Sequence, residues 1–320
     1  MPGLSRRRRG RGFSYLDAEG RPVRDEVMLE RIRALAIPPA WEDVWICPDA
    51  NGHLQATGVD AAGRKQYRYH DLWRERRDRQ KFAEVVGFAR ALPRLRRRIA
   101  RDLKAGDDGA PTRVRVLACA ARMLDLGFFR IGSESYAAGN GSFGLATIRK
   151  DHVRIAGDDV VFDYPAKSGQ RRVQAIADPD VRAVVSALKR RRGGPDELLA
   201  YRSGRRWVDV RSEDVNDYLK DRAGGSVSAK DFRTWNGTVL AAVALARRTD
   251  RPSSKTGRRR AAAAAVREVA VFLGNTPAVA RRSYIDPRVI DCFLAGDTIA
   301  PAHKRGRRAI EAAVLDLIAG

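Results

Sequence analysis

The sequence is poor in the residues that build disulfide frameworks and structural metal sites. Its 320 residues include only three cysteines, Cys47, Cys119 and Cys292. They lie far apart and without a CxxC spacing, which argues against a disulfide framework and against a structural zinc site. This cysteine usage is typical of a protein that stays in the reducing cytoplasm.

Clustered metal ligands and long apolar runs are also missing. The four histidines, at positions 53, 70, 152 and 303, are scattered, and the paired aspartates at 107–108 and 158–159 lie in glycine-containing turns without metal-ligand spacing. No stretch approaches the roughly 20 consecutive apolar residues that a membrane span requires. Arg6 to Arg9 are not followed by the apolar core of a signal peptide. We expect neither a metal, nor a cofactor, nor a membrane partner.

Positive charge is what the sequence has in excess. Lysine and arginine number 62 against 39 aspartates and glutamates, a formal net charge of +23. A surplus of this size is typical of proteins that neutralise phosphates, so nucleic acid is the leading partner. Two alternatives remain on charge alone, namely a protein from an arginine-rich proteome and a protein that binds membrane surfaces.

Length and pattern together predict an α+β protein with two domains. Residues 1–12, which include Arg6 to Arg9, have the composition of a flexible basic arm that could lie along a phosphate backbone, or of a plain disordered tail. Residues 13–92 alternate like strands broken by turns and predict a small β-rich domain. Residues 93–320 predict a larger, mainly helical domain with a short antiparallel sheet.

Strands of the first domain are expected at residues 43–47, 53–59 and 64–69, with a short helix over residues 26–35. In the last strand, basic and aromatic side chains alternate, which suits a surface that contacts DNA. The candidates for DNA contact are therefore Arg64, Lys65, Gln66, Tyr67 and Tyr69. Two tyrosines at period two can equally be packing residues, and the sequence leaves that alternative open.

The second domain is predicted from helix caps and turns. A helix over residues 74–91 should end near Pro93, and another should begin at Thr112 and stop at Gly127. Residues 145–149, 153–155, 160–166 and 171–176 predict an antiparallel meander, with Lys167 in its last turn. Helices should then begin at residues 178, 212 and 228, with Arg233 early on the third.

The final part of the chain predicts a basic loop and two helices. The loop covers residues 253–260, and a helix over residues 261–272 should end at Gly274 and Asn275. A short helix begins at Thr276-Pro277 and carries Tyr284 near its end.

Four ordered segments carry a family resemblance, namely residues 129–136, 167–169, 230–235 and 273–284. They read FRIGSESY, KSG, KDFRTW and LGNTPAVARRSY, and they closely resemble the small poxviral and bacterial type IB topoisomerases. Residues 63–69 and 144–154 share the likeness, which therefore spans nearly the whole chain beyond the basic tail. The resemblance implies a C-shaped clamp in which a β-rich domain and a helical catalytic domain close around duplex DNA.

The resemblance also implies a set of roles. Arg130 and Arg233 would hold the non-bridging phosphoryl oxygens, Lys167 would protonate the 5′-oxygen leaving group, and Tyr284 would attack phosphorus. Such residue types suit this chemistry, because guanidinium groups are fixed bidentate donors and a phenol can be a covalent nucleophile. The product would be a 3′-phosphotyrosyl bond, which is resealed after the DNA rotates, without ATP or metal. A monomer in the cytoplasm, on the nucleoid, is the expected working form.

The resemblance also bears on two further positions. Poxviral members have a histidine nine residues before the nucleophile, where this chain has Asn275, as bacterial relatives commonly do. An amide can donate one neutral hydrogen bond but cannot carry the charge of an imidazolium, so modestly altered rates are expected. Tyr136 matches a position beside the backbone phosphates, although it could also simply pack.

Each candidate has a structural alternative when taken alone. Arg130 could pair with Glu134, Lys167 could be a solvated turn residue, Arg233 could pair with a carboxylate, and Tyr284 could be a packing tyrosine. Two rival functions also exist. A tyrosine recombinase shares the order of the catalytic residues but usually shows His-x-x-Arg where this chain has KDFR, and a non-catalytic chromosome-binding protein explains the charge but not the motifs.

Overall fold

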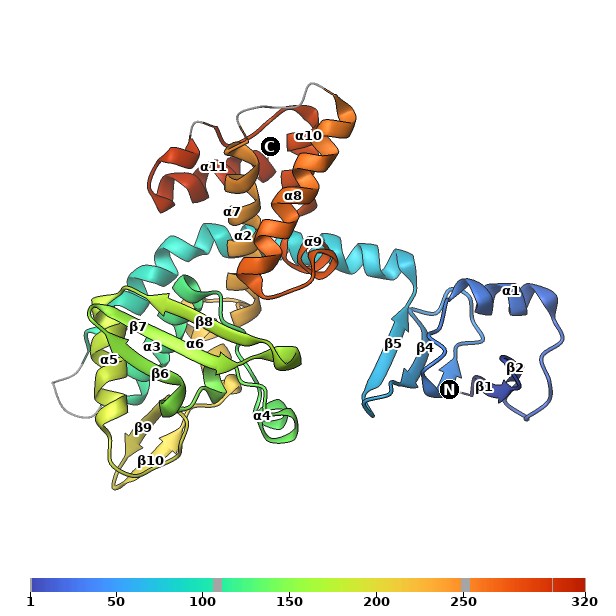
Figure 1. Ribbon diagram of the computed structural model, residues 1–320, viewed down its shortest axis with the longest axis horizontal. Coiled ribbons are helices and arrows are strands. Elements are labelled where there is room, and N and C mark those ends of the chain that lie inside the picture. Colours follow the sequence, from blue (N-terminus) through green and yellow to red (C-terminus); the bar gives the residue numbers. More distant parts are fainter. Residues whose placement is uncertain (1, 106–110, 249–253, 301, 320) are drawn as a thin grey trace. The chain divides into compact units, whose positions relative to one another are not determined.

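The computed structural model describes residues 2–105, 111–248, 254–300 and 302–319, except for the side chains at positions 136 and 168. The chain divides into two compact units, Met1–Ala83 and Glu84–Gly320 (Figure 1). Unit 1 is rich in strands and unit 2 is mainly helical with small sheets, so the predicted α+β class is confirmed. Among the described residues, every helix is too short or too polar to cross a membrane.

Unit 1 is built on a five-stranded sheet in the order β2-β1-β3-β4-β5, with every neighbouring pair antiparallel. The strands are β1 (Leu4–Arg9), β2 (Gly12–Leu16), β3 (Glu42–Ile46), β4 (Leu54–Val59) and β5 (Lys65–Tyr69). Helix α1 (Glu26–Ala34) begins where Asp25 accepts a hydrogen bond from the Val27 amide. Its buried Ile32 packs with Val44, Ile46 and Ala56, and this contact forms the core of the unit.

The basic amino terminus is not a flexible arm, and that prediction is wrong. Residues 4–9 form strand β1, which pairs with both β2 and β3. Arg6 donates to the carbonyls of Pro38 at 3.1 Å and Trp41 at 2.5 Å, and its guanidinium lies 4.1 Å from the ring centroid of Phe13. Strand pairing is a long-range interaction, so the composition of residues 1–12 alone could not reveal it.

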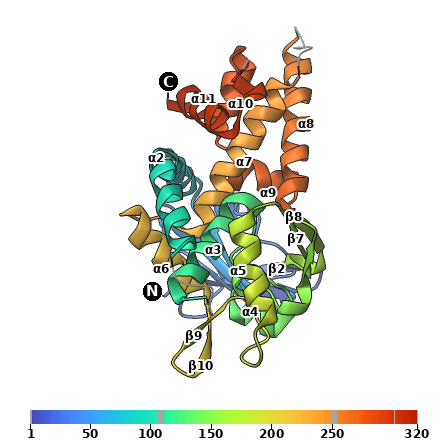
Figure 2. The same ribbon diagram turned by 90° about the vertical axis from the view of Figure 1, so that its left-hand side faces the viewer.

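Unit 2 surrounds helix α3 (Arg113–Gly127), which lies at its centre and contacts α5, α6 and α7 (Figure 2). A three-stranded sheet in the order β6-β7-β8 packs on α3 and α5. Strands β9 and β10 form a separate two-stranded sheet. The elements of the unit are α2 (Asp71–Leu103, shared with unit 1), α4 (Glu134–Asn140), β6 (Val153–Ala156), β7 (Asp159–Pro165), β8 (Arg171–Ile176), α5 (Pro179–Arg190), β9 (Ala200–Ser203), β10 (Arg206–Asp209), α6 (Ser212–Ala223), α7 (Ala229–Ala246), α8 (Lys255–Leu273), α9 (Pro277–Tyr284), α10 (Pro287–Ala295) and α11 (Arg307–Ala319).

One predicted helix end and one predicted cap conformation are wrong. Helix α2 runs unbroken through Pro93, so the boundary expected at residue 92 lies inside a helix. Leu92, Leu95 and Ile99 are each 1 % exposed, and the burial of this stripe outweighs the local preference of proline for a helix end. Helix α3 ends at Gly127, as predicted, but the residue in the left-handed conformation is Phe128, with φ of 54°.

Two loop and strand predictions also need correction. Residues 145–149 do not form the first strand of the meander, because Leu145–Thr147 is a single 3₁₀ turn. The other three strands are confirmed as β6, β7 and β8. The predicted basic loop of residues 253–260 is helical from Lys255 onward, since Ser254 caps α8 by accepting from the Gly257 amide at 3.0 Å. Position 253 lies outside the described residues.

A buried set of charges ties α2, α3 and α11 together, and we call it the Asp125 network. Asp125 is 2 % exposed and bonds Arg96 at 2.8 Å and Arg307 at 2.7 Å. Glu311 accepts from the same two arginines at 2.5 and 2.9 Å, and Arg122 lies 3.5 Å from Asp125. Burial by itself would lower the pKa of Arg96, but the hydrogen bonds to Glu311 and Asp125 raise it overall.

Candidate active site

Arg233 is positioned by the first turns of α7. Ser228 caps the helix, and its amide donates to the Asp231 carboxylate at 2.8 Å, which completes the predicted capping box. Arg233 is 4 % exposed and has no carboxylate partner among the described residues. It donates instead to the main-chain carbonyls of Phe128 and, at 2.9 Å, Leu273. The alternative of an ion pair for Arg233 is therefore wrong.

Arg130 follows the left-handed turn that ends α3. Its guanidinium donates to the Gly274 carbonyl at 2.8 Å and to the side-chain oxygen of Asn275. It does not pair with Glu134, whose carboxylate accepts from the Ser212 amide at 3.2 Å. Both arginines thus reach across the unit to the end of α8, where the last carbonyls of a helix are free to accept.

Tyr284 is the last residue of α9, as predicted. Thr276 caps this helix by accepting from the Val279 amide at 3.3 Å, and Pro277 occupies its first turn. The guanidinium carbon of Arg233 lies 5.0 Å from the centroid of the Tyr284 ring. The phenol is therefore close to a buried cation, and the ring also packs against the hydrophobic core of unit 2.

Helix α7 approaches the main chain of Tyr284 very closely. A Cβ atom added at Gly237 would lie 2.6 Å from the Tyr284 carbonyl oxygen, so only glycine fits there without displacement. The Thr238 hydroxyl lies 3.4 Å from the same oxygen and accepts from the Asp286 amide at 3.0 Å. These contacts fix the backbone on both sides of Ile285.

Lys167 lies in the turn between β7 and β8, as predicted. The turn is closed by the Ala166 amide, which donates to the Gln170 carbonyl at 2.8 Å, and it contains Gly169 in the left-handed region at φ of +70°. The lysine is exposed and forms no hydrogen bond or ion pair with any residue that the structure describes. Its ammonium is available to a ligand.

Arg130, Lys167, Arg233 and Tyr284 line one cavity of about 350 Å³, which we call the tyrosine cavity. These residues come from four different segments of unit 2, and only the folded chain brings them together. Lys230 also lines the cavity, one turn before Arg233 on α7. The cavity therefore combines four cationic side chains with one phenol.

The electrostatics of the tyrosine cavity favour a bound anion. Burial lowers the pKa of Arg233, against the opposing effect of the nearby Tyr284 phenol, and the neighbouring Arg130 lowers it further. Because the arginines here are held by neutral carbonyls, a bound phosphate would supply the negative charge that the protein does not.

Asn275 does not line the cavity, but it is joined to it through Arg130. The side-chain Oδ1 of Asn275 accepts from the Arg130 guanidinium, and its main-chain N–H donates to the Ala270 carbonyl at 2.9 Å. Its Nδ2 is buried and has no hydrogen-bond partner among the described residues. An unpaired buried donor is unfavourable, so a ligand oxygen at this point would be stabilised.

Sequence reasoning missed one residue that lines the cavity, Lys230, and two residues beside it, Arg172 and Gly237. Arg172 on β8 donates to the Phe272 carbonyl at the end of α8, and burial lowers its pKa, as does Arg130. Lys230 was seen only as part of a motif, and Gly237 was not considered. Arg171 and Arg172 are neighbours on β8 and therefore face opposite sides of the sheet, but the local sequence does not show which side faces the site.

The DNA-contact candidates of unit 1 fall into two groups. Arg64 and Gln66 both bond Asp60, at 2.8 Å each, and these contacts are within the β4–β5 turn region. The hydrogen bond from Arg64 holds the pKa of the Asp60 carboxyl well below its usual range, at about 2. Arg64 and Gln66 are therefore engaged by a carboxylate before any DNA binds.

Lys65, Tyr67 and Tyr69 form a row on one face of β5. The rings of Tyr67 and Tyr69 stack at 6.1 Å, Tyr69 stacks on Trp73 at 4.6 Å, and the Lys65 ammonium lies 6.0 Å from the Tyr67 ring. Tyr67 is still 50 % exposed, so packing and a free ring surface coexist here. Tyr136 lies in α4, but its side chain is outside the described part of the structure.

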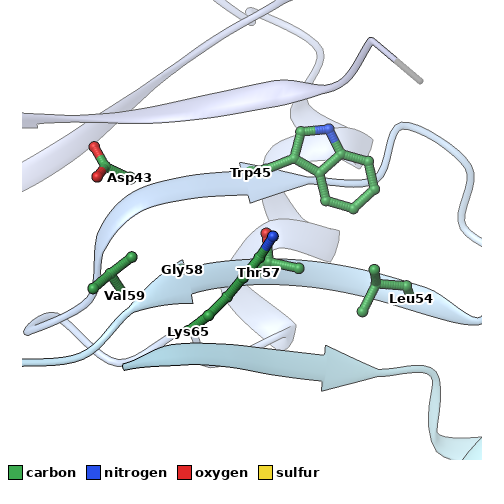
Figure 3. Close-up of a pocket in the computed structure, with 7 residues that line it drawn as sticks. All are labelled: Asp43, Trp45, Leu54, Thr57, Gly58, Val59 and Lys65. Atoms are coloured by element: carbon green, nitrogen blue, oxygen red, sulfur yellow. The ribbon is translucent and has the colours of Figure 1, made fainter. Parts of the chain in front are cut away.

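Beside this row lies a hollow of about 600 Å³ on the sheet of unit 1 (Figure 3). It is lined by residues of β3, β4 and β5, and Trp45, Thr57 and Tyr67 occupy paired positions across the three strands. Asp43 borders the hollow at an irregularity of β3, with φ of 48°. The core against α1 uses other side chains, Val44, Ile46 and Ala56, so this face is the one that α1 leaves open.

Within the described residues, no group of three or more His, Cys, Asp or Glu side chains could hold a metal ion. The polar groups that converge in the tyrosine cavity are instead cationic donors. They suit a phosphate and not a metal cation.

Comparison with known proteins identifies the family. Residues 70–290 match the family described as eukaryotic DNA topoisomerase I, catalytic core, and residues 12–60 match that of the bacterial DNA topoisomerase IB, N-terminal domain. The chain is 30% identical over 313 residues to DNA topoisomerase 1B of Acanthamoeba polyphaga mimivirus, covering 95% of this chain and 91% of the relative. It is 21% identical over 252 residues to DNA topoisomerase I of monkeypox virus and to DNA topoisomerase 1B of vaccinia virus, covering 78% of this chain and 75% of each relative.

The two family matches cover most of both units, and the first alone covers well over half of the chain. The match to the mimivirus protein extends over nearly the full length of both proteins. The chain therefore belongs to the type IB DNA topoisomerases, isomerases that act on DNA, and carries the bacterial form of their amino-terminal domain.

Proposed function

We propose that this protein relaxes supercoiled duplex DNA through a transient covalent bond between one strand and Tyr284. The observation that carries the proposal is the convergence of Arg130, Lys167, Arg233 and Tyr284 on one cavity. The phenol oxygen would attack the phosphorus, and the P–O5′ bond would break. The products would be a 3′-phosphotyrosyl bond and a strand with a free 5′-hydroxyl.

Arg130 and Arg233 would stabilise the charge that builds on the non-bridging oxygens. Their guanidinium groups are already oriented by carbonyls at the end of α8, so little reorganisation is needed when the phosphate binds. The free Nδ2 of Asn275 would donate a further hydrogen bond to one of these oxygens. Preorganised donors of this kind each contribute about a hundredfold to a thousandfold in rate.

Lys167 would give a proton to the 5′-oxygen as it leaves. Its position in an exposed turn, without a carboxylate partner in the described structure, leaves the ammonium able to reach a bound strand. The phenol proton would pass to water or another acceptor. Resealing is the reverse, in which the 5′-hydroxyl attacks the phosphotyrosyl bond and Tyr284 leaves; the bond energy is retained, so neither ATP nor a metal would be required.

DNA would contact unit 1 through the open face of its sheet. Lys65 supplies positive charge there, and Tyr67 offers a half-exposed ring next to it. Phosphate contacts dominate protein–DNA affinity, so binding should weaken steeply with salt. We further propose that one chain is sufficient, because every candidate catalytic residue comes from the same unit, and that the protein works in the cytoplasm on the nucleoid.

Plasmid relaxation tests the proposal directly. Purified protein is incubated with supercoiled plasmid in EDTA without nucleotide, and relaxation with a denaturant-resistant protein–DNA adduct is the expected result. The 5′ end of the cut strand should accept phosphate from polynucleotide kinase, which identifies the polarity of the adduct.

Tyr284→Phe should abolish both relaxation and the adduct, because it removes the attacking oxygen. Tyr201→Phe is the matched control, since Tyr201 is half-buried in β9 and does not line the tyrosine cavity. An adduct formed by Tyr284→Phe, or a cut strand with a blocked 5′ end, would overturn the assignment. DNA binding without relaxation by the wild type would leave only an architectural role.

A further inference from the structure

A second cavity in unit 2 is lined by residues of α2, α3, α7 and α11. Its volume is about 710 Å³, and it shares no lining residue with the tyrosine cavity. Six arginines line it, so we call it the arginine cavity: Arg90, Arg96, Arg97, Arg122, Arg307 and Arg308. The proposed DNA chemistry makes no use of it.

The charges around the arginine cavity do not balance. Arg96 and Arg307 are bonded to Asp125 and Glu311, and Arg122 bonds Asp178 at 2.8 Å. The other arginines, Arg90, Arg97 and Arg308, are exposed and form no hydrogen bond or ion pair with any residue that the structure describes. A ligand in the cavity would therefore meet positive charge that no carboxylate of the described structure neutralises.

Two of the six arginines are also held rigidly, and carboxylates balance their charge. The Asp125 network fixes the guanidinium groups of Arg96 and Arg307, each through at least two hydrogen bonds. Arginines that are held in advance lose little side-chain entropy when an anion binds. Planar guanidinium groups also match phosphate oxygens in bidentate geometry. The site is therefore suited to phosphate groups more than to a diffuse negative charge.

The remaining walls are apolar and aromatic. Ala89, Leu126 and Leu315 line the cavity, together with Trp235 of α7. Trp235 is 1 % exposed, and its Nε1 has no hydrogen-bond partner among the described residues. Pockets of roughly 300–1,000 Å³ with apolar walls and a few placed polar groups are typical of small-molecule sites. A cavity of this size and mixed lining fits a small ligand better than the long, regular surface of a duplex.

We propose that the arginine cavity binds a small organic polyphosphate of the nucleoside triphosphate class. The phosphate chain would be held by the charge of Arg90, Arg97 and Arg308, and the fixed guanidinium groups of Arg96 and Arg307 would add only hydrogen bonds. The organic part would pack on the apolar wall next to Trp235. Such binding is separate from the strand-cleavage reaction, which is proposed to need no nucleotide.

Trp235 provides a site-specific signal for the test. The chain has five tryptophans, so its ¹⁵N-labelled full-length form gives five indole N–H resonances. Trp235→Phe identifies one of them by its loss. If that variant does not fold, single substitutions of Trp41, Trp45, Trp73 and Trp207 identify the same resonance by elimination. ATP and inorganic tripolyphosphate, each without magnesium, are titrated separately at constant ionic strength.

We expect the Trp235 resonance to shift in a saturable manner with ATP. The double variant Arg97→Ala/Arg308→Ala should weaken binding by roughly tenfold or more, because it removes two charged donors. Arg190→Ala/Arg205→Ala is the matched control, since both residues are exposed, lie outside the cavity and lower the net charge equally. This control should change the affinity by less than about twofold.

Three results would overturn the proposal. The Trp235 resonance could stay unmoved by both probes, or the control variant could weaken binding as much as the cavity variant. Alternatively, a short duplex could shift the resonance where neither small probe does, which would make the surface a DNA site. A response to tripolyphosphate equal to that of ATP would retain the polyphosphate site and remove the nucleoside from it.

Discussion

The tyrosine cavity and the Asp125 network use the same side chain in opposite ways. In the network, Arg96 and Arg307 are satisfied by buried carboxylates. In the cavity, Arg130 and Arg233 are oriented by carbonyls and by an amide oxygen, all of them formally neutral. Neutral acceptors fix the geometry of a guanidinium but leave its charge available. The partner, and not the arginine, decides whether the group stabilises the fold or awaits a substrate.

Asn275→Asp tests this comparison most severely, with the largest expected effect. The new carboxylate would accept from Arg130 as the amide oxygen does, but it would add negative charge where the phosphate should bind. It would also remove the free Nδ2 donor. We expect single-turnover cleavage to fall by about a thousandfold while the melting temperature stays close to that of the wild type.

Asn275→Ala is the control for that variant, because it removes the donor without adding charge. The comparison predicts a clearly smaller loss for alanine than for aspartate. Equal losses in the two variants would mean that only the donor matters and that the neutrality of the arginine partners does not.

Asp125→Asn makes the reverse change in the network. It removes the negative charge that Arg96 and Arg307 share, although the side-chain shape is kept. Because the Asp125 side chain is only 1% exposed, we expect the free energy of unfolding to fall by about 3 kcal/mol in urea titrations. Asp217→Asn is the control, since this carboxylate is 70% exposed in its pair with Lys220 and should change stability by less than about 1 kcal/mol. Similar losses of stability in the two variants would mean that the buried carboxylate of the network does not stabilise the fold.

Asn275→His sharpens the comparison with a smaller effect. An imidazole can still donate to a phosphoryl oxygen, and when protonated it adds a positive charge instead of a negative one. We expect the single-turnover cleavage rate to stay within about tenfold of the wild type. A fall of several orders of magnitude would show that the pocket around Arg130 tolerates only the amide.

Asp209 contrasts with the paired Asp125, because it is a partly buried carboxyl that forms no ion pair with any described residue. Burial, and then the nearby Glu197 and Glu134, raise its pKa from 3.8 to about 7. The folded protein thus favours the protonated form, and its stability falls as the pH rises from about 4 through 7.

Asp209→Asn keeps the neutral form at every pH. Its stabilising effect should be near zero at pH 4, grow toward pH 7 and then level off, at less than about 1 kcal/mol after allowing for solvent screening. Thermal unfolding across this pH range measures it. Asp158→Asn, at a 94% exposed carboxyl, should show no such trend. A uniform effect of Asp209→Asn at all pH values would rule out titration as its cause.

Local signals predicted most of the elements of unit 2. Thr112, Asp178 and Ser228 cap helices as their sequence context indicated, and the short helix that carries Tyr284 begins at the predicted Thr276-Pro277. Capping and proline geometry depend on a few neighbouring residues, so one sequence is enough to identify them. The pairing of β1 and the continuity of α2 through Pro93 depend on distant contacts, and both were predicted wrongly.

The candidate site divides in a similar way. The ordered motifs pointed to Arg130, Lys167, Arg233 and Tyr284, and the fold brings these side chains to one cavity. What holds them was not predictable, because the acceptors are carbonyls of residues that are about 40 or more positions away, such as Leu273 for Arg233 and Gly274 for Arg130. A carbonyl has no signature in a sequence. Arg172 and Gly237 were missed for the same reason, because their partners are the main-chain carbonyls of Phe272 and Tyr284.

The tight contact between Gly237 and the Tyr284 carbonyl has a mechanical consequence. If Tyr284 carries the cut strand, the rotating DNA exerts a force on this residue during every relaxation event. The force passes to α7 through Gly237 and Thr238, and from there into the buried core around Phe232 and Trp235. As a nucleophile, Tyr284 would therefore be supported by the buried core of unit 2 and not by a free helix end, so strand rotation need not disturb the atoms that must reseal the break.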